Sequence, residues 1–193
     1  MIMNTIIRKI SGVSNIIKFR CNNISFGSHL RVVGNIGLTI QGKCSIGANF
    51  RCSSGDMSNA MGRNVSSYIK VGENALLSIG DNVGISSTCI WCDKNIRIGN
   101  NVKIGALTII TDTDAHSLNP VLRSNNETDG INAVKKPVEI CDNAFIGTSS
   151  VICKGVRIGQ NSIVGAGSVV THNIPDNEIW GGNPAVFIKK LDL

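Results

Sequence analysis

The sequence is poor in aromatic and charged residues, and it has only three histidines. Aromatic residues make up 4% and charged residues 17% of its 193 residues, and the charged fraction is below that of an average globular protein. Aliphatic side chains and tight turns at the 21 glycines must therefore form most of the interior. No apolar run is long enough to cross a membrane, and Arg8 and Lys9 interrupt the apolar start where a secretory signal would continue. We expect one globular domain in the cytoplasm.

Cysteine usage fits neither a disulfide framework nor a zinc finger. The count is seven, an odd number. Cys89 and Cys92 form a single CxxC motif with no second pair at zinc-binding spacing. A reducing compartment and no metal are the simplest expectation. The net charge of +6 favours an anionic partner, such as a phosphorylated cofactor or an acidic glycan, although a solvated basic face would give the same charge.

An aliphatic residue recurs at every sixth position of the chain. The longest run is unbroken and consists of Ile140, Ile146, Ile152, Ile158, Val164 and Val170. Weaker runs precede it, such as Ile40, Ile46 and Cys52, with breaks near residues 53–70, 86–97 and 111–139. A period of six is neither helical nor that of a long alternating strand. It predicts short strands and turns that wind into a prism, with one inward side chain per hexad and coils about 4.8 Å apart.

The first 23 residues do not share this rhythm. Ile2, Ile6, Ile10, Val13 and Ile17 would lie on one face of a helix. We expect residues 1–23 to cap the fold and residues 24–193 to form the prism. Weak peripheral contact with a membrane is the alternative role for this apolar face.

Three stretches carry a resemblance to a known family. They are SIGDNVGIS (78–86), RIGNNVKIG (97–105) and the segment from Ala144 to Leu191, which contains Gly-Ala-Gly-Ser-Val-Val and ends near Gly-Asn-Pro-Ala. Their [Ile/Val]-Gly-x-x-x-x pattern resembles the hexapeptide repeat of left-handed β-helix acetyltransferases, including those that modify maltose, galactosides and capsular or lipopolysaccharide sugars. The resemblance implies an all-β, left-handed parallel β-helix with a long protruding loop at 111–137 and a short C-terminal tail. The left hand rests on the resemblance alone, because parallel crossovers are otherwise right-handed.

The rhythm stops in the stretch ITDTDAHSLNP (110–120), and 30 residues separate Ile110 from Ile140. A long loop on a compact repeat scaffold is more often functional than accidental. His116 lies near its start, and histidine suits general-base catalysis because it titrates near neutral pH. In the family, the catalytic histidine occupies this position. The alternative is a loop histidine that bonds its own backbone.

Asp112 and Asp114 flank this histidine in sequence. One of them could accept from the imidazole and fix its tautomer, or both could form Asx-turns that shape the loop. A zinc site of the carbonic anhydrase kind would need clustered histidines, whereas His29, His116 and His172 are scattered.

The resemblance also assigns residues to substrates. It places CoA, the acetyl donor, in a groove between subunits of a homotrimer. Thr148, Ala166 and Thr171 match contacts along its arm, and Lys189 matches a basic residue near its 3′-phosphate. Lys154 and Lys190 are further candidates for the phosphates, because His172 and Val186 stand where the family often has lysine and arginine. Asp93 matches a carboxylate that binds the acceptor.

These observations favour an acetyl-CoA-dependent O-acetyltransferase that acts on a sugar hydroxyl of a surface polysaccharide or its precursor and binds no nucleic acid. A xenobiotic acetyltransferase is the alternative enzyme. A trimeric β-helix that serves only for assembly is the alternative without catalysis.

Overall fold

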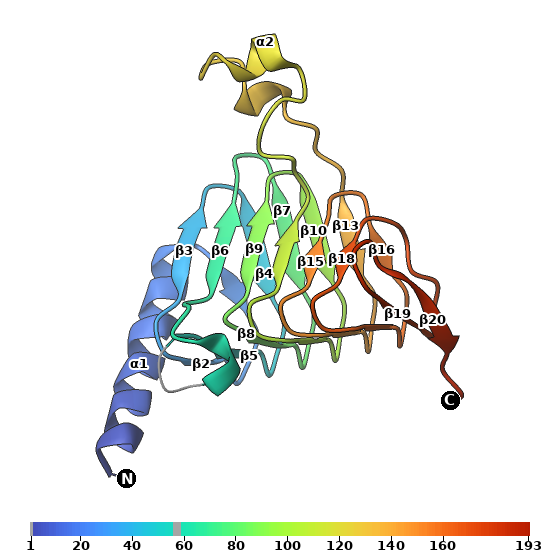
Figure 1. Ribbon diagram of the computed structural model, residues 1–193. Coiled ribbons are helices and arrows are strands. Elements are labelled where there is room, and N and C mark those ends of the chain that lie inside the picture. The colour runs from blue at the N-terminus through green and yellow to red at the C-terminus, as the bar shows by residue number, and fades with distance from the viewer. Residues whose placement is uncertain (1, 56–58) are drawn as a thin grey trace.

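A computed structural model describes residues 2–55 and 59–193, with side chains described from residue 12 onward. The chain winds into a three-sided prism, and each coil contributes one strand to each of three sheets (Figure 1). Within the sheets every pairing is parallel except that of the last two strands. The expected left-handed parallel β-helix is confirmed. A helix, α1 (Ile2–Cys21), lies at the N-terminal end of the prism.

The three sheets are named A, B and C after their order along a coil. Sheet A consists of β1 (Ser25–Phe26), β4 (Lys43–Ile46), β7 (Leu76–Ile79), β10 (Asn95–Ile98), β13 (Val138–Ile140) and β16 (Arg157–Ile158). Sheet B consists of β2 (Arg31–Val33), β5 (Arg51–Ser53), β8 (Gly84–Ser86), β11 (Lys103–Ile104), β14 (Phe145–Ile146), β17 (Ile163–Val164), β19 (Glu178–Gly181) and β20 (Val186–Lys190). Sheet C consists of β3 (Gly37–Ile40), β6 (Tyr68–Val71), β9 (Cys89–Cys92), β12 (Ile109–Thr111), β15 (Val151–Ile152) and β18 (Val169–Val170).

The six-residue rhythm marks the axis of the prism, as expected. All six members of the longest run, from Ile140 to Val170, are buried, and none is more than 1% exposed. Cys52 of the weaker upstream run is buried as well. Side chains alternate along each short strand, so the residues beside these core positions point outward. The core is therefore one aliphatic column, and each outer face is free to differ.

A ladder of asparagines holds the corner between sheets A and B. Each has a left-handed backbone, with φ near 60°, and its amide bonds the amide of the next coil at 2.7–3.1 Å. The ladder consists of Asn49, Asn82, Asn101, Asn143, Asn161 and Asn177. Asparagine tolerates this conformation better than most residues. The ladder thus provides a tight turn and a side-chain bond between successive coils.

Two of the three breaks in the rhythm are loops. One lies between β5 and β6, where the described residues 59–67 include a short 3-10 helix, η1 (Ala60–Gly62). Residues 112–137 leave the prism between β12 and β13 and include α2 (Pro120–Arg123) and η2 (Gly130–Asn132), close to the expected loop at 111–137. The third break, at 86–97, is not a loop. There β9 continues sheet C and buries both Ile90 and Cys92, so only the spacing is irregular.

Helix α1 covers the first coil. The side chain of Phe19 is fully buried, and the buried amide of Asn15 donates to the carbonyls of Val32 and Gly34. Val13 and Ile17 are exposed on its outer side. The expected apolar face also includes Ile2, Ile6 and Ile10, whose side chains are outside the described residues. In the described part of the chain, no helix combines the length and hydropathy needed to span a bilayer.

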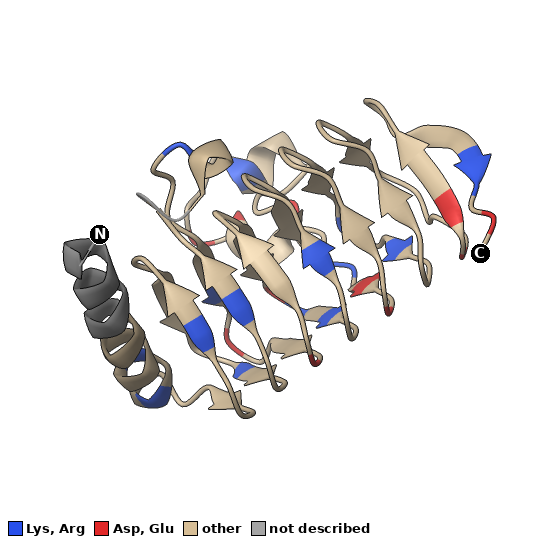
Figure 2. Cartoon of the chain, turned by 90° about the horizontal axis from the view of Figure 1, so that it is seen from below, with Lys and Arg blue, Asp and Glu red and all other residues tan. Residues whose placement is uncertain are grey.

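The outer faces of the three sheets differ in character. Sheet A is polar, and Glu139 pairs there with Arg97 at 2.6 Å and with Arg157 at 3.5 Å. Sheet C has an apolar row in continuous register: Tyr68, Cys89, Ile109, Val151 and Val169. Sheet B, which faces the viewer in Figure 2, has basic side chains on several strands nearer the N-terminus and few charges on the strands that follow. Sheet A therefore suits solvent, whereas sheets B and C suit partners.

Candidate active site

Asp112 closes the base of the long loop. Its side chain is fully buried and accepts three backbone N–H groups, from Asp93 at 2.7 Å, Lys94 at 2.8 Å and Asn95 at 2.7 Å. Burial and the neighbouring charge of Asp112 raise the pKa of the Cys92 thiol to about 12. The expectation that Asp112 orients His116 is wrong, because both of its oxygens are engaged in holding the turn after β9. Its alternative role, that of shaping the loop, fits these contacts.

Asp114 does not orient the imidazole either. Its Oδ1 lies 2.5 Å from Nζ of Lys154, and its Oδ2 is buried without a hydrogen-bond partner among the described residues. Its backbone N–H donates to the carbonyl of Val134, where the returning strand of the loop pairs with the departing one. Asp112 and Asp114 thus fix the stem of the loop, and the reactive group lies beyond them.

The partner of His116 is Asp129, thirteen residues further on. The imidazole Nδ1 lies 2.6 Å from Oδ2 of Asp129, and Oδ1 of the same carboxylate accepts the N–H of Ser117 at 2.7 Å. These two bonds lower the pKa of Asp129 below its ordinary value of 3.8, the bond from His116 being the larger cause. An ionised carboxylate can only accept, so Nδ1 must carry the hydrogen. In the neutral imidazole Nε2 is then left as the acceptor, which is the form a general base needs.

The loop presents this histidine to the outside. The His116 side chain is 68% exposed, whereas that of Asp129 is 14% exposed. Arg123 of α2 donates to the carbonyl of Ser117 at 2.8 Å and braces the turn. Large apolar side chains, those of Leu118, Val121 and Ile131, are exposed on the same loop. An exposed base beside exposed apolar side chains indicates a surface that is completed by another molecule.

Asp93 belongs to the turn that Asp112 holds. Its backbone N–H is one of the three donors to Asp112, and its carboxylate lies over Gly72 of the preceding coil, where an added Cβ would come within 2.5 Å of Oδ1. A role of Asp93 in acceptor binding stays a prediction.

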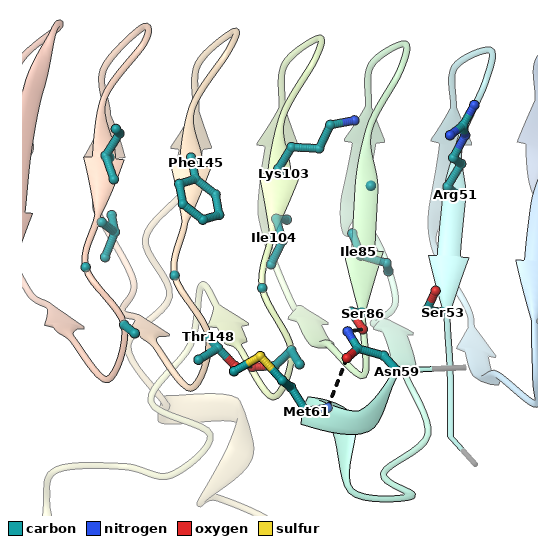
Figure 3. A pocket seen from close by; sticks show the side chains of 18 residues that line it. Arg51, Ser53, Asn59, Met61, Ile85, Ser86, Lys103, Ile104, Phe145 and Thr148 are labelled. Atoms are coloured by element: carbon teal, nitrogen blue, oxygen red, sulfur yellow. Dashed lines mark hydrogen bonds between the residues drawn. The ribbon is translucent and has the colours of Figure 1, made fainter. Parts of the chain in front are cut away.

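A groove of about 600 Å³ runs along the outer face of sheet B. Its floor comes from strands β5, β8, β11, β14 and β17, and one wall comes from η1 (Figure 3). Asn59 anchors this wall, since its side chain donates to Ser86 Oγ at 2.7 Å and accepts the N–H of Met61. The lining is mainly apolar, with Met61 and Phe145 as its large side chains and glycines on the floor. Its length and lining suit a long, thin ligand.

Two of the expected CoA contacts, Thr148 and Ala166, line this groove. The Thr148 hydroxyl donates to the carbonyl of Ala106 at 2.5 Å. The others do not line it. Lys189 and Lys190 are exposed on β20, further along the same sheet, and Thr171 bonds the neighbouring His172 at 2.9 Å. Of the three expected contacts to the CoA arm, Thr148 and Ala166 lie together in the groove and Thr171 lies outside it, so CoA binding at these residues stays a prediction.

The loop and the groove lie on opposite sides of one chain. In Figure 1 the loop with α2 projects from the edge between sheets A and C, whereas β2, β5 and β8 of sheet B form the opposite side. A single prism stands between the imidazole of His116 and the groove.

Comparison with known proteins agrees with the repeat. Residues 137–172 match the family of bacterial transferase hexapeptide repeats, six of them. This segment of the chain is therefore similar to the hexapeptide repeat of bacterial transferases. The matched residues include β13 to β18 and the two expected CoA contacts that line the groove, Thr148 and Ala166. The hexapeptide repeat therefore builds the part of the groove where the resemblance placed CoA.

Proteins with similar sequences include two galactoside O-acetyltransferases. The one from Lactococcus lactis is 37% identical over 52% of this chain and 45% of its own length. The one from Escherichia coli is 34% identical over 65% of each chain. The present chain thus spans about half to two thirds of these relatives. Among solved structures, AntD, an N-acyltransferase from Bacillus cereus in complex with a dTDP-linked amino sugar and coenzyme A, has a TM-score of 0.69 at 22% identity, covering 88% of this chain and 84% of its own.

Proposed function

We propose that this chain is an acetyl-CoA-dependent O-acetyltransferase acting on a sugar hydroxyl. The observation that carries the proposal is the His116–Asp129 pair, which leaves Nε2 of an exposed imidazole free to accept a proton. The relatives named as galactoside O-acetyltransferases support both the reaction and a sugar acceptor. The seven cysteines, all free, agree with a reducing cytoplasm, where we place the reaction.

The groove on sheet B fits the donor. It is long, narrow and mainly apolar, and Thr148 and Ala166 lie on it at positions that match arm contacts in the family. Bound there, acetyl-CoA would supply an activated acetyl thioester. His116 Nε2 takes the proton of the sugar hydroxyl as its oxygen forms the new ester bond, and the same nitrogen returns the proton to the departing sulfur. Asp129 keeps Nδ1 protonated and the ring in place throughout.

We further propose that the enzyme is a cyclic homotrimer. A single chain keeps His116 and the groove on opposite sides. A threefold arrangement that packs the apolar row of sheet C toward sheet B of the next copy would bury both faces, leave polar sheet A in solvent and bring the loop of one copy to the groove of another. The exposed Leu118, Val121 and Ile131 would then be covered.

His116→Ala tests the reaction directly. We expect transfer to fall about 10²–10⁴-fold, the usual worth of a general base. Affinity for CoA and the melting temperature should stay close to wild type, because the exposed imidazole adds little to the core. His29→Asn is the matched control, since His29 is an exposed turn histidine with φ of 59°, which asparagine adopts readily.

The measurements are the transfer rate to a panel of sugars, CoA affinity and melting temperature. Unchanged transfer in His116→Ala would rule out the base. A collapsed melting temperature would assign His116 a structural role instead. Acetyl transfer by wild type to small drug-like acceptors but to no sugar would favour the xenobiotic alternative.

A further inference from the structure

The groove on sheet B is divided by charge. Outward side chains in continuous register along the sheet begin with Arg31 and Arg51, pass Gly84 and reach Lys103. The same row continues with Phe145 and Ile163. Its N-terminal half is therefore basic and its C-terminal half apolar. Figure 3 shows Lys103 on the same strand as Ile104 and Arg51 two strands further on, on the side away from Phe145.

Among the described residues, none neutralises the cations Arg51 and Lys103 of this row. No acidic residue of that part of the chain lines the groove, and none of its ion pairs involves Arg51 or Lys103. The Lys103 side chain lies across Gly84, where an added Cβ would be 3.4 Å from its Cδ, and its ammonium donates to the carbonyl of Asn82 at 2.9 Å. Arg51 is two strands away, at a distance of about 10 Å for parallel strands. Two separated, unpaired cations in one groove form a site for an anionic ligand.

The position of the reacting atoms along the prism axis decides which anionic ligand this site would bind. The loop with His116 follows β12 directly, in the same coil as β11 and Lys103. Rotation about a threefold axis parallel to the prism does not move a copy along that axis. His116 of one copy would therefore meet the neighbouring copy near Lys103 and Phe145. Thr148 and Ala166 lie on the C-terminal side of that position, where the donor is placed. The basic half lies on the other side and is left for the acceptor.

We infer that the acceptor is a sugar that bears a phosphate group, with Arg51 and Lys103 as the phosphate-binding residues. This inference rests on the proposed function. A guanidinium binds phosphate through two parallel N–H···O bonds, and an ammonium adds a point charge. The sugar ring would lie near His116 of the neighbouring copy, and the phosphate or diphosphate would lie along the groove between Lys103 and Arg51. A sugar monophosphate and a nucleotide-linked sugar share this chemistry.

The test compares three acceptors that have the same sugar: a neutral methyl glycoside, the 1-phosphate and the nucleotide-diphosphate form. The variants are Arg51→Gln and Lys103→Gln, with Arg97→Gln on sheet A as a matched control of equal charge change. We expect Arg51→Gln to lower kcat/KM for the phosphorylated acceptors about 10- to 100-fold, the usual worth of charge-assisted bonds. Arg51→Gln should turn over the methyl glycoside as wild type does. The control Arg97→Gln should turn over all three acceptors as wild type does. The phosphorylated acceptor with the higher kcat/KM in wild type shows whether the phosphate group belongs to a sugar monophosphate or to a nucleotide-linked sugar.

An assay with a second acetyl donor distinguishes binding of the acceptor phosphate at Arg51 from binding of the phosphates of CoA there. Acetyl-pantetheine lacks those phosphates, so an effect of Arg51→Gln that persists with this donor belongs to the acceptor. An effect that disappears with it, an equal loss for neutral and phosphorylated acceptors, or dissociation of the oligomer in Arg51→Gln would overturn the inference. Wild type that acetylates only neutral sugars would refute it and leave the proposed function standing. Wild type that acetylates nothing would refute the proposed function itself.

Discussion

Replacing Asp129 by asparagine tests the general-base geometry by changing a single atom. The amide oxygen of asparagine can still accept the N–H of Ser117, which Asp129 holds at 2.7 Å. The amide nitrogen then faces Nδ1 of His116, 2.6 Å away in the wild type. That nitrogen only donates, so Nδ1 must become the acceptor and the ring hydrogen moves to Nε2. A protonated Nε2 cannot take the hydroxyl proton, although the loop is still anchored.

The expected loss follows from what the base is worth. General-base catalysis contributes about 10²–10⁴-fold, or roughly 2.7–5.4 kcal/mol at 1.36 kcal/mol per factor of ten. Asp129→Asn should lose most of this and approach His116→Ala. Asp129→Ala removes the anchor at Ser117 as well, but it leaves Nδ1 free to carry the hydrogen. We therefore expect Asp129→Ala to be faster than Asp129→Asn, although it is the more disruptive change to the loop.

The assay should detect the acetylated sugar directly, by mass spectrometry, because free cysteines such as the exposed Cys21 would react with a thiol reagent. The pKa of Asp129 is lowered, so the carboxylate stays ionised throughout the neutral range. The sign follows from that direction: its contribution to stability is fully present above the pKa of the unfolded state and is lost only as the pH falls through the lower folded value. Rates can therefore be compared near neutral pH without titrating this group.

The relative transfer rates of Asp129→Ala and Asp129→Asn decide whether Asp129 fixes the tautomer of His116. If Asp129→Ala is as slow as or slower than Asp129→Asn, with a loop more open to protease, then Asp129 acts as an anchor for Ser117 and the tautomer argument is wrong. If both variants keep wild-type rates, the His116–Asp129 pair has no part in catalysis.

Two further predictions concern architecture. Asn101 of the corner ladder has φ of 59°, and both Asn101→Gly and Asn101→Ala remove its amide bonds. Alanine is also strained in the left-handed conformation, so the free energy of unfolding from denaturant titrations should be about 1 kcal/mol lower for Asn101→Ala than for Asn101→Gly. Equal values would show that the backbone relaxes. Light scattering should give three times the chain mass of 20.5 kDa, and a monomer at assay concentration would contradict the shared site.

The buried column was predictable because burial repeats strictly. Every coil must place an aliphatic side chain on the axis, and the run from Ile140 to Val170 shows this in the sequence alone. The corner ladder left a signal as well. Gly80-Asp81-Asn82 and Gly99-Asn100-Asn101 repeat the same turn in successive coils, and their asparagines bond each other at 3.0 Å. The two turns are 19 residues apart, one more than three hexads, so this second repeat also shows that the coil containing residues 86–97 has one extra residue.

The partner of His116 was not predictable in the same way. The sequence offered Asp112 and Asp114 because they are close along the chain. The loop folds back on itself through the Thr113–Lys135 bridge, and this return brings Asp129 to the imidazole. Asp112 is instead committed to the three N–H groups after β9. No periodic pattern governs a non-repetitive loop, so neighbours in sequence are poor guides to neighbours in space within it.

The division between repeat and exception also explains how one prism carries two kinds of site. A hexad constrains the inward residue, and the residue just before it points outward with no such constraint. On sheet B these outward positions are Arg51, Gly84 and Lys103, followed by Phe145 and Ile163. Each can change without disturbing the column, because the backbone pairing beneath it is unaffected. Specificity for an acceptor could therefore change one strand at a time along the groove, while the loop that holds the base stays tied to a single coil by Asp112.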